Sequence, residues 1–213
     1  MSPWDESNLE SVSRRRLLCA AAGLPLLGAG LPAQAGGQVE EPLADAVRSA
    51  LAAAVATDGA PPKPVFDDME PRLNYLRWLG AMSDRLKKLA QEARTRIEFL
   101  ETVWYESKRA GLEPALVLGL IQMESGFRKY AISSVGARGY MQVMPFWSRL
   151  IGDGDASKLF HTQTNLRFGC VILRHYLNLE RGDLFLALGR YNGSRGQAKY
   201  PTAVLGLRQR WMA

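Results

Sequence analysis

One glutamate follows an apolar stretch of the chain, and no second acid comes after it for some distance. Residues 115–121 read ALVLGLI, Glu124 follows shortly after them, and residues 125–152 contain neither Asp nor Glu. A carboxyl group carried into apolar surroundings loses hydration, and desolvation disfavours its charged form. Such a group keeps its proton near neutral pH and can serve as a general acid, as carboxyl groups do in glycosidic bond cleavage. We therefore interpret Glu124 as a candidate catalytic acid.

The position of Glu124 depends on the helix that is expected to carry it. Pro114 suits the first turn of a helix, and the residues that follow are apolar on every side of the helical wheel. A helix without a polar face must be buried. The sequence thus predicts a central, enclosed helix with Glu124 at its C-terminal end.

Apolar residues at spacings of three and four predict further helices before and after this one. An amphipathic helix is expected within residues 40–56, and a short helix after Pro71. Ser83-Asp84 has the look of an N-cap, so one long helix is expected from there to Gly111. Later helical patterns cover residues 164–179, 183–191 and 201–211. Strand-like alternation is absent over any useful length, so the predicted fold class is mostly α, with at most a minor hairpin in the loop before Pro145.

Three ordered motifs make the chain similar to a known family. ESGFRKYAISSVGARGYMQVMP (124–145) resembles the Glu-Ser signature and Gly-Leu-Met-Gln loop of the soluble lytic transglycosylases. ALGRYNGS (187–194) resembles the family's Ala-Tyr-Asn-Ala-Gly motif, and Tyr200 with Val204-Leu205 its final Tyr-Val-x-x-Val-Leu segment. The resemblance covers residues 97–211, and three motifs in order are far more specific than a lone short pattern.

The resemblance implies a lysozyme-like catalytic domain that acts on the glycan strands of peptidoglycan. In that family one glutamate serves first as acid and then as base, and the 6-hydroxyl of the sugar is the nucleophile that closes a 1,6-anhydro ring. A retaining or inverting hydrolase needs a second carboxyl group. A transglycosylase does not, which would explain the acid-free residues 125–152. The resemblance implies no cofactor.

The resemblance also implies roles for residues around the acid. Ser133 is expected to hydrogen-bond the 2-acetamido group or the 6-hydroxyl of the sugar. Gly136 and Gly139 permit tight turns that bring the next residues of the loop toward the groove. The remaining expected substrate-binding residues are Met141, Gln142, Tyr191, Asn192 and Tyr200, of which Tyr200 is also expected to hydrogen-bond Glu124.

Several positions depart from the family pattern. Tyr140 replaces the usual leucine, Arg190 replaces the alanine before Tyr-Asn, Gly193-Ser194 replaces Ala-Gly, and Pro201 follows Tyr200 where valine is usual. None of these changes touches the acid, so they bear on subsite preference rather than on reaction class. Arg190 is expected either to bind stem-peptide carboxylates or, preferably, to be solvated.

Two other functions remain open on the sequence alone. A lysozyme-type hydrolase would need a second acid, for which Asp153, Asp155 and Asp183 are the candidates. A non-catalytic wall-binding protein would keep the groove without turnover, which an intact Glu124 argues against. The two histidines, His161 and His175, belong to unrelated contexts and do not indicate a metal site.

The N-terminus has the pattern of an export signal. Ser13-Arg14-Arg15-Arg16 precedes the weakly hydrophobic residues 17–31, and Ala33-Gln34-Ala35 resembles a cleavage site. The pattern favours the twin-arginine type, with an ordinary Sec signal as the alternative. We expect residues 1–35 to be a cleavable signal peptide, residues 36–96 a helical extension with a Pro-rich linker at 58–64, and residues 97–213 the catalytic domain.

The net charge of the chain and its expected export limit the kinds of partner that we expect it to bind. The chain has 27 basic and 21 acidic residues, a net charge of +6, which favours a polyanionic partner. Together with export, the resemblance selects peptidoglycan strands in the periplasm, with no nucleic acid and no stable membrane span after signal cleavage. A protein partner is left open, as is the choice between cutting at chain ends and cutting internally.

Overall fold

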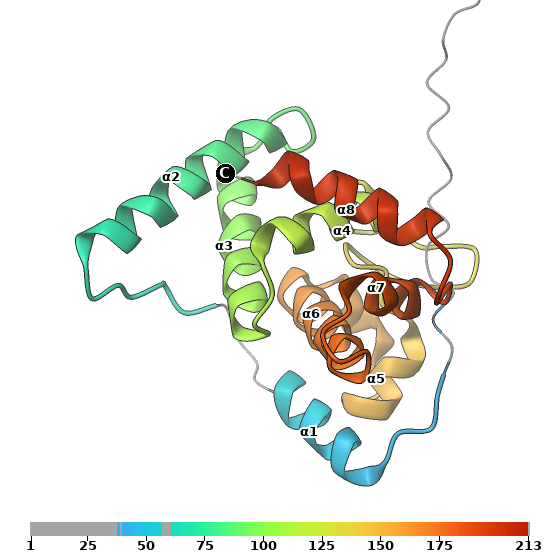
Figure 1. Cartoon of the computed structure of the whole chain (residues 1–213). Coiled ribbons are helices and arrows are strands. Elements are labelled where there is room, and N and C mark those ends of the chain that lie inside the picture. The colour runs from blue at the N-terminus through green and yellow to red at the C-terminus, as the bar shows by residue number, and fades with distance from the viewer. Residues whose placement is uncertain (1–37, 39, 57–60, 213) are drawn as a thin grey trace, which may run out of the picture. The chain divides into compact units, whose positions relative to one another are not determined.

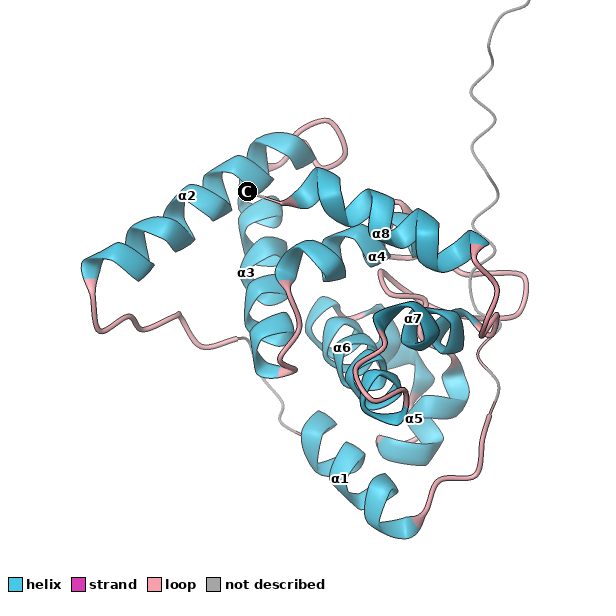
Figure 2. Ribbon diagram, viewed as in Figure 1, coloured by secondary structure: helices cyan, strands magenta, loops and turns pink. Residues whose placement is uncertain are grey.

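The computed structural model describes Gln38, residues 40–56 and residues 61–212. The predicted signal peptide therefore lies outside the described residues, as does part of the predicted linker at 58–64. Across the described ranges the regular secondary structure is helical, with loops between the helices (Figure 2). The prediction of a mostly α fold with additional N-terminal helices is confirmed.

The central helix is α4, Pro114–Ser125, and it is buried as its composition predicts. Leu118, Leu120 and Ile121 are fully buried, and Pro114 occupies the first turn, where a missing N–H leaves no bond unmade. Gly126 ends the helix in the left-handed conformation at φ 56°. The last turn of α4 thus holds Glu124 at a fixed place in the interior.

Helix α8, Lys199–Trp211, lies against α4 (Figure 1). The two backbones approach so closely that a Cβ added at Gly119 would be 2.7 Å from the backbone nitrogen of Arg208. Any side chain at this position would force the helices apart. The glycine in ALVLGLI is therefore a packing residue, and the close contact brings Tyr200 of α8 to the end of α4.

Helices α3, Ala93–Arg109, and α6, Thr162–Leu179, pack together beside α4. Their interface contains a fully buried carboxylate, Glu106, which forms ion pairs with Arg109 at 2.9 Å and with Arg167 at 3.0 Å. Gln163 donates a further hydrogen bond to the same carboxylate. Buried charges require such pairing, so this cluster fixes how α3 and α6 meet.

The N-terminal helices contact different parts of the domain. Helix α1, Asp45–Val55, packs against α6 and against α5, Pro145–Ile151. Helix α2, Met69–Leu86, packs against α3 through a cluster of rings that includes Tyr75, Trp78 and Trp104. The predicted domain boundary at 96/97 falls within α3 and remains a prediction.

The predicted N-cap at Ser83-Asp84 is wrong. Helix α2 continues through both residues, and Ser83 is buried with its hydroxyl accepting a hydrogen bond from Arg96 at 3.1 Å. The cap of α3 is Glu92, whose carboxylate accepts hydrogen bonds from the backbone of Arg94 at 2.9 Å and of Thr95 at 2.5 Å. A serine forms a cap only when its backbone leaves the helix, and here a tertiary contact holds it inside one.

Two short elements follow the acid-bearing helix and were not predicted. These are α5 and a 3₁₀ turn, Ala156–Phe160. The predicted minor hairpin is present only as isolated bridges that join Arg138 to Ile132 and to Val143. Helix α7, Leu184–Asn192, begins at the predicted place because the Asp183 carboxylate accepts the backbone N–H of Leu186 at 2.9 Å.

Candidate active site

Glu124 is a buried carboxyl group with a single hydrogen-bonding partner among the described residues. The residue is only 3% exposed. The Tyr200 hydroxyl donates a hydrogen bond to Oε1, as expected from the sequence, whereas Oε2 is buried without a partner. One oxygen of the carboxyl group is thus held by the protein, and the other makes no bond to it.

This environment keeps the carboxyl group protonated at neutral pH. Burial raises the pKa of Glu124 to about 8, and the hydrogen bond from Tyr200 acts in the opposite direction without overcoming it. Because Tyr200 donates to Oε1, the proton of the neutral acid belongs on Oε2. The protein thereby holds a proton on the oxygen that has no protein partner.

The loop after Glu124 is folded back on itself by its own polar groups. The Ser133 backbone N–H donates to Ala137 O at 3.0 Å, and the Ala137 N–H donates to Ser133 Oγ at 3.0 Å. The Gln142 side-chain amide donates to Ala131 O at 3.1 Å and to Gly139 O at 2.9 Å. Ser133 and Gln142 therefore both set the shape of this loop.

Gln142 also adopts an uncommon backbone conformation. Its φ is 49°, in the left-handed region that non-glycine residues rarely occupy, and its side chain is 1% exposed. Such strain persists only where the surroundings over-determine it, and residues of this kind cluster at functional sites. The two amide hydrogen bonds supply that constraint here.

Met141 and Tyr191 form a second contact between the sequence motifs. The Tyr191 hydroxyl donates to Met141 O at 2.8 Å, and both side chains are buried. The pKa of Tyr191 is raised well above its usual value, first by burial and then by the charge of Glu124, which places this tyrosine near the acid. The Met141 side chain fills the space that a Cβ at Gly169 would occupy.

Asn192 is the last residue of α7, and one polar atom of its side chain has no hydrogen-bonding partner among the described residues. The amide nitrogen donates to Ser194 Oγ at 3.0 Å, but Oδ1 is buried and has no partner among the described residues. A buried carbonyl oxygen without a donor costs free energy unless a ligand supplies one. Within the predicted set, Asn192 and Glu124 are the residues that have an unpartnered buried oxygen.

The structure thus links only some of the predicted residues directly. Tyr200 bonds to Glu124, and Tyr191 bonds to Met141. The hydrogen bonds of the Ser133 side chain and of Gln142 stay within their own loop.

Asn165 on α6 is a positioning residue that the sequence analysis missed. Its Oδ1 accepts the backbone N–H of Met141 at 2.8 Å, and its amide donates to Arg138 O and Leu159 O at 2.8 Å each. A Cβ at Gly139, where φ is 76°, would come within 2.3 Å of this amide. The available signal was an asparagine directly before the apolar run of this helix, together with a glycine in the loop that it holds.

The three aspartates considered as a second acid are exposed and occupied with turns and caps. Asp153 forms an ion pair with Lys158 and accepts the backbone N–H of Asp155 at 3.0 Å. Asp155 accepts the backbone N–H of Ser157 at 2.9 Å, and Asp183 caps α7. Hydrogen bonding holds the pKa of both Asp153 and Asp155 below its ordinary value. These groups have the local roles typical of structural acids.

Arg190 is partly exposed, and its guanidinium is already paired with two carboxylates of this chain. It forms ion pairs with Glu180 and, at 3.1 Å, with Glu41 in the segment before α1. Glu180 also pairs with Arg195 at 2.7 Å, and the two arginines lower the pKa of Glu180 to about 2. The departure from the family pattern at position 190 therefore ties the N-terminal segment to the end of α6.

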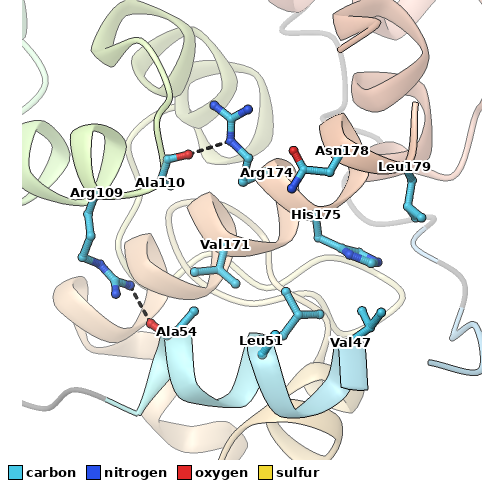
Figure 3. Close-up of a pocket in the computed structure, with 11 residues that line it drawn as sticks. Val47, Leu51, Ala54, Arg109, Ala110, Val171, Arg174, His175, Asn178 and Leu179 are labelled. Carbon is cyan, nitrogen blue, oxygen red and sulfur yellow. Dashed lines mark hydrogen bonds between the residues drawn. The ribbon is translucent and has the colours of Figure 1, made fainter. Parts of the chain in front are cut away.

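A cavity of about 480 Å³ lies between α1, the end of α3 and α6, and none of the predicted site residues lines it (Figure 3). Arg109 and Arg174 are among the lining residues, and both bond to backbone carbonyls, Ala54 O at 2.7 Å for Arg109 and Ala110 O at 2.6 Å for Arg174. Those carbonyls belong to helix ends that need donors. The cavity is therefore a packing space beneath α1, and its lining includes the imidazole of His175.

The described part of the chain has neither a metal-binding cluster nor a membrane-spanning helix. Its His, Cys, Asp and Glu side chains form no cluster of three or more that could bind a metal ion. None of its helices has the combination of length and apolar character that crossing a bilayer requires.

Comparison with known proteins identifies the same region of the chain. Residues 101–203 match the family described as Transglycosylase SLT domain. The transglycosylase of Enterobacteria phage PRD1 is 35% identical over 105 residues, which are 49% of this chain and 38% of that protein. Membrane-bound lytic murein transglycosylase C of Actinobacillus pleuropneumoniae serotype 5b is 38% identical over 100 residues, 46% of this chain and 26% of that protein.

A solved structure is also similar to this chain. The lytic transglycosylase Slt of Pseudomonas aeruginosa, in the form of an inactive mutant, matches 66% of this chain and 27% of its own with 23% sequence identity and a TM-score of 0.42. The chain therefore spans well under half the length of each of these relatives. The resemblance inferred from the three sequence motifs is confirmed.

Proposed function

We propose that the protein, whose residues 101–203 match the family described as Transglycosylase SLT domain, cleaves the β-1,4 bond between N-acetylmuramic acid and N-acetylglucosamine in peptidoglycan. The observation that carries the proposal is the state of Glu124. Its pKa is about 8, and its proton belongs on the oxygen that has no protein partner. A general acid for a glycosidic oxygen requires both properties.

In the first step Glu124 gives its proton to the glycosidic oxygen. The bond from C1 of the muramic acid residue to that oxygen breaks, the N-acetylglucosamine leaves with the proton, and positive charge develops at C1. The carboxylate that remains is stabilised by the hydrogen bond from Tyr200, which favours the charged form. Tyr200 therefore acts on the group that changes charge.

In the second step the same carboxylate acts as base. It removes the proton from the 6-hydroxyl of the muramic acid, and the bond from O6 to C1 forms the 1,6-anhydro ring. Glu124 is then protonated again, so the cycle balances with one carboxyl group. Positioning of the 6-hydroxyl replaces a second catalytic acid, since intramolecular attack from an oriented group lowers the barrier.

The roles of Asp153, Asp155 and Asp183 in turns and caps support a single-acid mechanism. Each accepts local backbone hydrogen bonds, and burial, with no contribution from a neighbouring carboxylate, is what raises the pKa of Glu124. A retaining enzyme would place a second carboxyl group within about 5 Å of the first, and an inverting one within about 10 Å.

In the proposed function, one of the predicted substrate-binding residues contacts the substrate and the others hold the structure around the acid. Asn192 has the buried Oδ1 that a sugar hydroxyl or acetamido N–H could satisfy. The others hold the loop and helices around the acid in place, through the hydrogen bonds of Ser133 and Gln142 in the loop, the Met141–Tyr191 contact, and the bond from Tyr200 to Glu124.

Digestion of purified sacculi followed by mass analysis of the muropeptides tests the proposal. A lytic transglycosylase releases 1,6-anhydromuramyl ends. A lysozyme-type hydrolase releases reducing ends that are heavier by one water molecule, and a wall-binding protein without activity releases nothing. Products with reducing ends, or no products, would reject the proposed reaction.

We place this activity in the periplasm after export through the N-terminal signal. The proposal rests on the arginine-containing motif at residues 13–18 and on the relative from Actinobacillus pleuropneumoniae, which is named as a membrane-bound lytic murein transglycosylase. Replacing Arg14 and Arg15 by lysine should abolish periplasmic yield if the signal is of the twin-arginine type. Unchanged yield would assign the segment to the Sec route.

A further inference from the structure

Most of the cations in the acid-free segment after Glu124 form no ion pair with a carboxylate that the structure describes. Among the described residues, no carboxylate pairs with Arg128, Lys129 or Arg138, whereas Arg149 pairs with Glu40 at 3.4 Å. The Arg128 guanidinium donates to Ser125 O at 2.9 Å, so this cation lies at the end of the helix that carries the acid. The net positive charge of the protein is therefore concentrated partly in the loop beside its active site.

The same loop exposes apolar and aromatic surface. Tyr130 is 71% exposed, Ile132 65% and Val135 55%. The ring of Tyr130 contacts that of Phe160 at 6.0 Å between centroids, with the Lys129 ammonium 5.4 Å from the Tyr130 ring. Clustered exposed apolar side chains next to a functional site are typical of ligand-binding surfaces.

This surface is held rigidly. Backbone bridges join Ile132 to Arg138 and Arg138 to Val143, and the Gln142 amide donates to the carbonyl of Ala131, the residue after Tyr130. The Arg138 guanidinium lies 5.6 Å from the Phe160 ring and donates to Ala156 O at 2.8 Å. A surface fixed in this way loses little conformational entropy when a ligand binds.

We propose, on the basis of the function given above, that Lys129 and Tyr130 form a recognition site for peptide-bearing glycan. The Tyr130 ring stacks on the C–H face of a sugar, and the Lys129 ammonium, with Arg128 beside it, pairs with carboxylates of the stem peptide. Peptidoglycan presents both chemical groups at adjacent points along one strand. The enzyme therefore prefers strands that keep their peptides over strands from which an amidase has removed them.

Steady-state kinetics on the two kinds of strand tests this inference. Lys129→Gln should raise KM about two- to fivefold on peptide-bearing strands, as expected for an exposed ion pair, and leave KM on stripped strands unchanged. Tyr130→Ala should raise KM about five- to tenfold on both strands, since both contain the sugar, and Tyr130→Phe should restore it because the ring remains. In every case kcat should stay near the wild-type value, because neither side chain touches the acid.

Lys108→Gln is the matched control, because the Lys108 ammonium also lies over an aromatic ring, 5.0 Å from that of Trp104 on α3. It should leave KM unchanged on both strands. Equal effects of Lys129→Gln and Lys108→Gln, or equal effects of Lys129→Gln on both strands, would overturn the peptide-recognition role.

Binding of the variants in a Glu124→Gln background to immobilised strands separates affinity from turnover. Lost affinity for anionic phospholipid vesicles, with binding to strands unchanged, would assign the surface to a membrane and overturn the proposal. If the wild type forms no anhydro products, the proposed function itself fails. If it forms them and the Lys129 and Tyr130 variants bind and turn over like wild type, only this inference fails.

Discussion

Glu106 and Glu124 are both buried glutamates, yet their surroundings differ in every respect that matters for chemistry. Glu106, between α3 and α6, has two arginine partners, Arg109 and Arg167, and the amide of Gln163. Glu124, at the end of α4, has only the hydroxyl of Tyr200 and one oxygen without a partner.

The comparison shows how the same residue type becomes structural in one place and reactive in another. A buried carboxylate surrounded by cations keeps its charge and links the elements that supply them. A buried carboxyl group without a cation keeps its proton instead, because desolvation disfavours the charged form. The distinguishing feature is therefore the missing arginine, since both groups are equally removed from water.

Replacement of Glu124 should have the largest effect, and this effect should be on activity, in contrast to that of replacing Glu106. Glu124→Gln should preserve the fold, because the amide is nearly isosteric, and should lower the rate of lysis by about 10⁴-fold, the upper end for general acid catalysis, since one group makes both proton transfers. Release of soluble muropeptides from sacculi measures the rate. Residual activity within tenfold of wild type would contradict the single-acid mechanism.

Glu106→Gln should act on stability instead. Removal of one member of a buried ion pair leaves uncompensated charge, so the free energy of unfolding should fall by about 3 to 5 kcal/mol, while folded protein keeps its kcat. Urea unfolding provides the measurement. Glu98→Gln is the control on the same helix, because the exposed pair of Glu98 with Arg94 should contribute less than about 1 kcal/mol. Equal losses in the two variants would remove the distinction between buried and exposed pairs.

The raised pKa of Glu124 should also appear in the pH dependence of stability. In the folded protein Glu124 keeps its proton up to about pH 8. In the unfolded chain the group has its ordinary pKa of 4.5, so it loses the proton at lower pH. Stability of the wild type should therefore fall as pH rises from 4.5 to about 8 and then level off, by an amount on the order of 5 kcal/mol.

Glu124→Gln lacks this titration and is the control for it. Urea unfolding at pH 5 and pH 9 should show the wild type losing stability relative to the variant at the higher pH. If the free energy of unfolding changed with pH in the same way for wild type and variant, Glu124 would titrate in the folded protein as it does in an unfolded chain.

The smallest effects are expected at the exposed acids. Single Asn replacements at Asp153, Asp155 and Asp183 should each keep activity within about tenfold, since none of these groups takes part in proton transfer. Asp183→Asn should cost at most about 1 kcal/mol of stability, because asparagine also caps helices. A collapse of activity at one of the three, with reducing ends among the products, would show a second catalytic acid.

The sequence predicted the features that depend on local pattern. The apolar stretch in residues 115–121 predicted a buried helix, Glu124 was placed at its end with a raised pKa, and the bond from Tyr200 was anticipated from the family motif. The N-cap at Ser83-Asp84 was wrong because the buried contact of Ser83 with Arg96 overrides the local preference of serine for helix ends.

Other features were decided by tertiary structure alone. The sequence by itself determined a helical protein with one acid in an apolar setting, because periodicity and composition are local properties of the chain. Only the packed molecule decided that Glu106 receives two arginines and Glu124 none, that Asn165 holds the backbone of Met141, and that Arg190 pairs with Glu41. Apart from Arg109, which lies three residues from Glu106 on the same helix, these partners are far apart in sequence, and which of them meet depends on how the helices pack.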